Sequence, residues 1–175
     1  MTVLTIKPTA EDHRIAYMAA LAIVLMLMEA ALPSPIPGVK PGLANIVTLL
    51  VLQQYGLRAA VWVTGLRVVA GSMLLGSFLT PGFVLSLSGA LASLAILAVA
   101  RYLPGRYFGM VSLSILAAFA HIAAQLTVVS AWLMPSVNVF YLSPAFALAA
   151  GVFGLSNGLI TAYLVKEASH ANSPA

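Results

Sequence analysis

Six apolar stretches follow one another along the chain and restrict its fold more than any other feature. Charges, prolines and glycines divide them, and they cover about residues 15–32, 41–55, 57–78, 82–100, 109–133 and 142–165. A bilayer core about 30 Å thick needs roughly 20 apolar residues of α-helix. Apolar residues make up 62% of the chain and charged residues 7%, against about 45–50% and about 25% in soluble domains. The pattern predicts an all-α integral membrane bundle of six transmembrane helices surrounded by lipid. It excludes a soluble enzyme, a disordered chain and a nucleic-acid-binding domain.

The second stretch is the shortest, because its apolar core, Leu43–Gln54, reaches only about 18 Å as a helix. Loop charges indicate whether it crosses. With six crossings, six of the eight Lys and Arg residues lie inside and Lys40 lies outside. Without the second crossing, and with the N-terminus still inside, two of these basic residues would lie inside and five outside. The positive-inside rule therefore favours six crossings with both termini cytoplasmic.

This topology predicts a single membrane domain over residues 15–165, with cytoplasmic tails at 1–14 and 166–175. An alternative makes residues 15–32 a cleaved signal peptide. That stretch is long for a signal peptide, and no clean Ala-x-Ala site follows it.

Motifs for catalysis and cofactor binding are missing from the sequence. The chain has no cysteine and no G-x-x-x-x-G-K-[ST] loop, and Asp12 is its only aspartate. We therefore expect no metal, no cofactor and no catalytic residue in this chain. If it moves a solute uphill, an ion gradient or a partner must supply the energy.

A segment rich in proline and glycine, residues 33–42, separates the first two stretches. Four prolines and two glycines in ten residues cannot form a helix. One interpretation is irregular backbone that dips into the membrane beside a binding site, with Pro37, Gly38 and Gly42 in its loop. The other is a rigid extracellular turn, with Pro41 in the first helical position of the second span.

Polar residues gather around this segment. Glu29 precedes it, Lys40 lies within it, Asn45 follows it, and Arg67 lies midway along the third span. An unpaired arginine there costs at least about 2.5–3.5 kcal/mol, so it should face the bundle interior. We expect a Glu29–Arg67 or a Glu29–Lys40 pair that leaves one cation for an anionic ligand. The alternatives are a purely structural ion pair, or an Arg67 that reaches to the cytoplasmic surface.

Two later spans carry further polar residues. A helical period places four on one face of the fifth span: Ser114, His121, Gln125 and Trp132. His121 and Gln125 are candidates for ligand or proton contacts, although a lone membrane histidine often only packs against a neighbouring helix. Asn157 lies in the sixth span beside Gly154-x-x-x-Gly158, a spacing that favours close helix approach.

The segment Pro37-Gly38-Val39-Lys40-Pro41-Gly42-Leu43-Ala44-Asn45-Ile46 resembles that of a bacterial membrane family, labelled both Gx transporter and heptaprenyl diphosphate synthase component I. Glu29, Arg67 and Ala120-His121 with Gln125 also match, and the resemblance runs from about Ile15 to Val165. Two positions depart from the family pattern. Pro41 stands where we expect an apolar residue, and Ile122 stands where we expect an asparagine.

The family is similar to the substrate-binding subunits of energy-coupling-factor transporters, which are six-helix proteins of the bacterial cytoplasmic membrane. This resemblance implies capture of a vitamin-like or cofactor-like solute near the outer face. It also implies docking of a transmembrane coupling subunit, which works with ATPases, on an alanine face such as Ala16 and Ala20.

Two hypotheses for the function follow. In the first, the chain is a substrate-binding subunit whose site residues are Lys40, Arg67, Glu29, Asn45, His121, Gln125 and Asn157. In the second, it is a non-catalytic membrane anchor for a prenyl diphosphate synthase or a flavin-linked redox enzyme.

Overall fold

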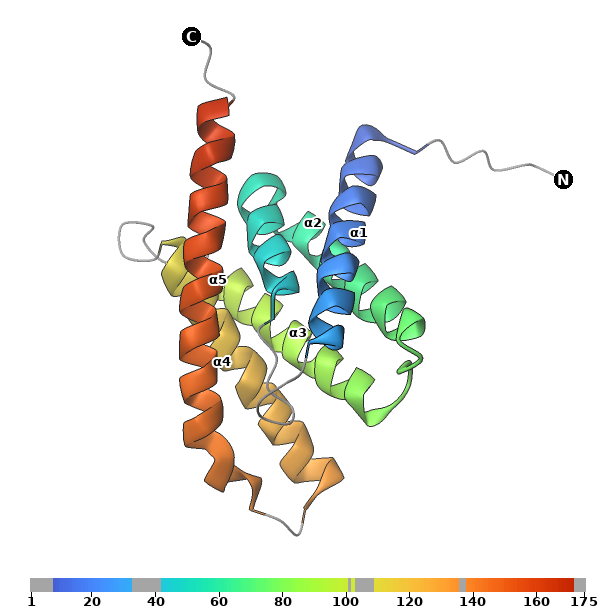
Figure 1. The fold of residues 1–175 in the computed structure, drawn as a ribbon, viewed down its shortest axis with the longest axis vertical. Helices are drawn as coiled ribbons and strands as arrows, with labels where there is room; N and C mark the ends of the chain where they lie inside the picture. The colour runs from blue at the N-terminus through green and yellow to red at the C-terminus, as the bar shows by residue number, and fades with distance from the viewer. Residues whose placement is uncertain (1–7, 33–41, 101, 103–108, 136–137, 172–175) are drawn as a thin grey trace, which may run out of the picture.

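The computed structural model describes residues 8–32, 42–100, 102, 109–135 and 138–171. Over these residues the chain forms a bundle of long helices (Figure 1): α1 (Ala10–Ala31), α2 (Ala44–Leu74), α3 (Pro81–Ala100), α4 (Met110–Val128) and α5 (Ser143–Ala171). A π-helical turn, η1 (Val129–Leu133), extends α4, and a 3-10 turn, η2 (Val139–Leu142), precedes α5. All five long helices are apolar enough to cross a bilayer. The all-α prediction is confirmed, and the chain is a multi-pass membrane protein.

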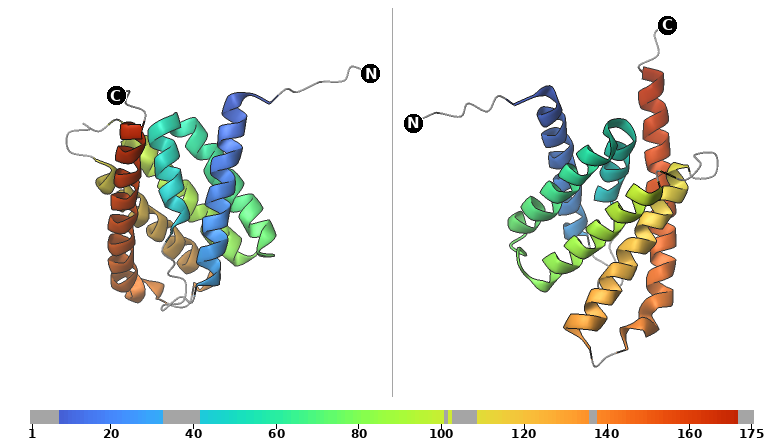
Figure 2. Two further views of the ribbon diagram at one scale, coloured as in Figure 1. Left: turned by 45° about the horizontal axis from the view of Figure 1, so that its top comes forward. Right: turned by 180° about the vertical axis from the view of Figure 1, so that it is seen from behind.

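Helix α2 is broken at Gly56, where the backbone has φ 82° and ψ −179°. This conformation is essentially restricted to glycine. Figures 1 and 2 show Ala44–Tyr55 running toward one end of the molecule and the chain turning back after Gly56. The two parts of α2 correspond to the second and third predicted spans. Six crossings remain a prediction, because the described residues form five helices long enough to span, with the two parts of α2 counted as one.

Local backbone geometry explains where helix ends differ from the predicted spans. Helix α1 begins at Ala10 rather than residue 15, because Thr9 and Asp12 form a reciprocal capping box. At the other end of the predicted third span, α2 stops at Leu74 rather than at residue 78. Gly76 (φ 65°) and Leu79 (φ 61°) adopt left-handed backbone there, which no helix continues through.

Small side chains allow the helices to pack closely. A Cβ atom on Gly158 would lie 2.7 Å from Val111 Cα, and one on Gly154 would lie 2.9 Å from Ile115 Cα. The predicted close approach through these glycines therefore joins α5 to α4. Helices α1 and α2 pack through another cluster of small and branched residues: Ala19, Ala22, Val47, Val51, Ala59, Ala60 and Val63, with Leu94 of α3.

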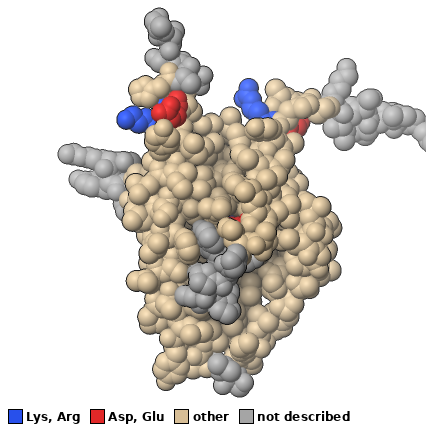
Figure 3. Space-filling view, in the orientation of Figure 1, with Lys and Arg blue, Asp and Glu red and all other residues tan. Residues whose placement is uncertain are grey.

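Charged residues gather at the end of the molecule where α1 begins and α5 ends. Figure 3 shows most of the charge on its face at this end, above a broad uncharged surface. Glu11 and Arg14 of α1 line a groove there with Tyr55 and Ala59, on either side of the break in α2. The break thus lies at the same end as the start of α1, as the six-crossing topology expects.

Replacing Gly56 with alanine tests the break. We expect Gly56→Ala to lower the free energy of unfolding by about 1–3 kcal/mol, through backbone strain alone. No atom lies within 4 Å of the added Cβ atom, so no clash contributes. Gly65→Ala is the matched control, because Gly65 is helical and its added Cβ atom also meets open space. It should be neutral or stabilising by up to about 1 kcal/mol. If the two substitutions change the free energy of unfolding in detergent equally, Gly56 is not a strained break in α2.

Single cysteines on this naturally cysteine-free chain test the topology. With six crossings, a membrane-impermeant thiol reagent labels Arg58→Cys and Glu167→Cys only after the inner face is opened. Met134→Cys and Gly38→Cys label from outside intact cells. Labelling of Arg58→Cys from outside would refute the crossing of the first part of α2.

Candidate functional site

Gly42 is the point at which three helices meet. Its N–H donates to Glu29 Oε1 of α1 at 2.5 Å, and its carbonyl accepts from Asn157 Nδ2 of α5 at 3.2 Å. The same carbonyl accepts from Asn45 N at 2.8 Å, which starts α2. Gly42 has φ +69°, and a Cβ atom there would lie 3.1 Å from Asn45 Nδ2. The backbone conformation therefore favours glycine, and an added Cβ atom would press on the Asn45 amide.

The Glu29 carboxylate caps the start of α2. Its second oxygen, Oε2, accepts from Leu43 N at 3.1 Å, so both oxygens bind backbone N–H groups. Glu29 is only 6% exposed. A carboxylate at a helix N-terminus satisfies donors that lack a partner within the helix and opposes the positive end of the helix dipole.

Arg67 lies in the second part of α2 and is 7% exposed. Its Nη1 donates to Asn45 Oδ1 at 3.1 Å. Its Nε is buried and has no hydrogen-bond partner among the described residues. A buried donor without a partner costs roughly 1–3 kcal/mol. The described residues therefore leave one donor of Arg67 unsatisfied.

Helices α3 and α4 form the opposite wall. Ser93 Oγ donates to the Ala117 carbonyl at 3.0 Å and lies 3.3 Å from His121 Nδ1. The His121 ring packs directly on Gly89, where a Cβ atom would lie 2.5 Å from Nε2. Gln125 Nε2 donates to the Leu85 carbonyl of α3 at 3.3 Å. These contacts fix the orientation of both side chains.

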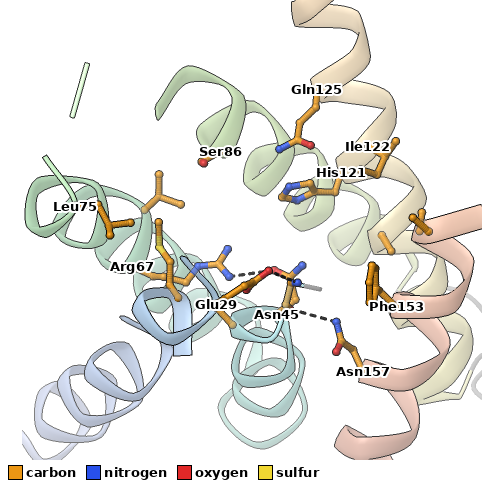
Figure 4. A pocket seen from close by; sticks show the side chains of 17 residues that line it. Glu29, Asn45, Arg67, Leu75, Ser86, His121, Ile122, Gln125, Phe153 and Asn157 are labelled. Atoms are coloured by element: carbon orange, nitrogen blue, oxygen red, sulfur yellow. Dashed lines mark hydrogen bonds between the residues drawn. The ribbon is translucent and has the colours of Figure 1, made fainter. Parts of the chain in front are cut away.

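These two polar walls enclose one cavity between the α1–α2 pair and helices α3 to α5 (Figure 4). The cavity has a volume of about 170 Å³. The lining residues are Met26, Glu29, Gly42, Ala44, Asn45, Arg67, Val68, Leu75, Ser86, Ala118, His121, Ile122, Gln125, Ala149, Ala150, Phe153 and Asn157.

The structure places seven predicted residues around this cavity: Glu29, Gly42, Asn45, Arg67, His121, Gln125 and Asn157. Their roles in binding remain predictions. The expected Glu29–Arg67 ion pair is not formed, because Glu29 binds the backbone of α2 and Arg67 binds Asn45. The burial of Arg67 also contradicts the alternative in which it reaches the cytoplasmic surface.

The other predicted residues lie elsewhere. On the predicted face of the fifth span, Ser114 packs against Gly158 and Trp132 is 59% exposed. Ala16 and Ala20 are exposed on α1, while Ala19 and Ala22 are buried against the bundle. Three predicted site residues fall outside the described part of the chain: Pro37, Gly38 and Lys40.

Sequence reasoning missed the apolar wall and the glycines that shape the site. Met26 and Phe153 line the cavity, but nothing distinguishes them from other apolar residues of their helices. Gly71, whose added Cβ atom would lie 2.7 Å from Met26 Sδ, was also overlooked. A helical projection would have found Gly71, because it lies one turn from Arg67 on α2.

A family model described as heptaprenyl diphosphate synthase component I matches residues 18–164. The match confirms the resemblance inferred from the sequence and covers most of the chain. No curated protein and no solved structure matches this chain in the corresponding searches.

The helix cap made by Glu29 can be tested by removing its charge. We expect Glu29→Gln to lower the free energy of unfolding by about 1–3 kcal/mol, because an amide nitrogen cannot accept from Gly42 N or Leu43 N. Glu167→Gln removes the same charge from an exposed position on α5 and should change stability by less than about 0.5 kcal/mol. Thermal unfolding in detergent measures both. An equal shift would show that Glu29 acts only through net charge.

Proposed function

We propose that this chain, which belongs to the heptaprenyl diphosphate synthase component I family, is a membrane-embedded subunit that binds a small anionic solute for transport. The binding site is the cavity between the α1–α2 pair and helices α3 to α5. Its setting is the bacterial cytoplasmic membrane, with both termini on the cytoplasmic side.

The observation that carries this proposal is the state of Arg67. Its guanidinium lies in the cavity with a buried Nε that has no partner among the described residues. Glu29, the only acidic side chain among the described residues that line this cavity, already accepts two backbone hydrogen bonds. A positive charge that no acidic side chain pairs within the described site favours an anionic ligand, which gains charge-assisted hydrogen bonds there.

Transport requires an energy source that this sequence does not provide, because it contains no ATP-binding motif. A coupling subunit with its ATPases, or an ion gradient, supplies it in this proposal. Ala16 and Ala20 are exposed on α1, and small residues such as these allow a partner helix to approach closely.

The family description favours a second candidate function. It names a component of a synthase, which implies a separate partner protein. In this alternative the chain is a non-catalytic membrane anchor for a prenyl diphosphate synthase or a flavin-linked redox enzyme, and the cavity has no solute to bind.

Native mass spectrometry of the protein released from detergent separates the two functions. We expect the wild-type chain to retain a small molecule and Arg67→Ala to lose it, with at least a tenfold fall in occupancy. Arg58→Ala is the matched control, because it removes an exposed cation at the break in α2 and should retain the molecule.

An empty wild-type protein that co-purifies with a soluble enzyme would support the anchor and overturn the transport proposal. Equal occupancy in wild-type and Arg67→Ala protein would place any bound molecule outside this cavity. Circular dichroism should confirm that both variants keep their helices.

A further inference from the structure

We infer that the cavity selects a monoanion that also carries a neutral N–H or O–H donor on the side opposite its acid group. This inference rests on the proposed function and defines the chemical class of the solute. It follows from the hydrogen-bonding capacity that the described residues leave unused on the two walls of the cavity.

The wall formed by α2 presents donors. Arginine can only donate, so the oxygen of the Asn45 amide must face Arg67 Nη1. The structure has this arrangement, with Nη1 and Oδ1 3.1 Å apart. The Asn45 nitrogen, Nδ2, then remains as a donor with no acceptor among the described residues. Asn45 and the Arg67 guanidinium both line the cavity, and donors of this kind suit carboxylate oxygens.

The wall formed by α4 presents an acceptor at Gln125. A carbonyl oxygen can only accept, so the contact with Leu85 O must involve Gln125 Nε2. Gln125 Oε1 is left without a donor among the described residues. Figure 4 shows Gln125 and His121 together on α4, across the cavity from Asn45 and Arg67.

His121 adds a second acceptor to this wall. Ser93 has one hydroxyl proton and donates it to Ala117 O, so the contact between Ser93 Oγ and His121 Nδ1 requires Nδ1 to be the donor. In the neutral ring, Nε2 then carries the lone pair. A ligand group that lies against the α4 wall is therefore matched if it donates and mismatched if it only accepts.

The charges of the described lining residues, which do not include Lys40, favour a ligand with one negative charge over one with two. Arg67 contributes one positive charge and Glu29 one negative charge, and the N-terminus of α2 adds about half a positive charge. With a monoanion these charges sum to about −0.5, and with a dianion to about −1.5, so they disfavour the dianion. A phosphate ester carries about −1.5 to −2 at pH 7 and would lie beside the fixed Glu29 carboxylate with a single arginine to balance it. Between the polar walls, Met26, Leu75 and Phe153 offer apolar contact to the body of the ligand.

Four related probes test each part of this inference by titration calorimetry on the detergent-purified chain. Indole-3-acetate has a carboxylate and a ring N–H. 1-Methylindole-3-acetate lacks the donor, indole-3-acetamide lacks the charge, and indoxyl phosphate carries the higher charge. We expect indole-3-acetate to bind at least about tenfold more tightly than each of the others, the factor that corresponds to about 1.4 kcal/mol.

Two variants assign these preferences to residues. Gln125→Met should remove the preference for indole-3-acetate over its 1-methyl derivative and leave the preference over the amide. Arg67→Gln should remove the preference over the amide. The wild-type comparison stands by itself if either variant fails to fold.

Three results would overturn the inference: tighter binding of indoxyl phosphate, equal binding of the 1-methyl derivative, or binding of none of the four. If none binds but the wild-type chain retains a cellular molecule that Arg67→Ala loses, the proposed function stands and only the ligand class is wrong. If none binds and nothing is retained, both fail.

Discussion

The hydrogen bonds between the Glu29 carboxylate and the start of α2 determine how the rest of the site is arranged. A helix that begins inside an apolar bundle has N–H groups that water does not reach, and each one left unsatisfied in a membrane costs several kcal/mol. Glu29 accepts from two of them, at Gly42 and Leu43. Because α2 starts there, Asn45 lies in the first turn of the helix and meets Arg67 from the second part of α2. The position of the arginine thus depends on the acid, although the two do not form an ion pair.

This cap also explains how the shortest apolar stretch fits the bundle. Its helix, Ala44–Tyr55, is too short to cross a bilayer core unless its first turn already lies within the protein. Gly42 provides that beginning, because its N–H and carbonyl groups bind Glu29 and Asn157 on two different helices. Irregular backbone is tolerated at such depth when protein groups satisfy it. Gly56 then reverses the chain at the other end with a conformation that other residues rarely adopt.

The sequence allowed much of the site to be predicted, because a polar side chain within an apolar helix needs a specific reason to be there. Glu29, Asn45 and Arg67 were identified in this way. Their partners were not, because a backbone N–H group has no signature in the sequence and competes equally for a carboxylate. Trp132 was assigned to the face of His121 by a projection that assumed a regular α-helix, whereas it lies in the π-helical turn η1. The π-helical turn η1 has a wider period and changes the direction of the residues that follow it.

The unsatisfied nitrogen of Arg67 is the observation that favours the proposed binding site over a purely structural contact. Buried ion pairs are often no more stabilising than apolar residues of the same volume, and a buried cation without an acidic partner is less favourable still. A purely structural arginine would gain from a second acceptor, yet Asn45 is its one hydrogen-bond partner in the described site. Glu29, which could have supplied that acceptor, is held by α2 instead. A buried cation with an unsatisfied hydrogen-bond donor is expected where a ligand completes the site. Only the ligand-bound state then gives every buried donor an acceptor.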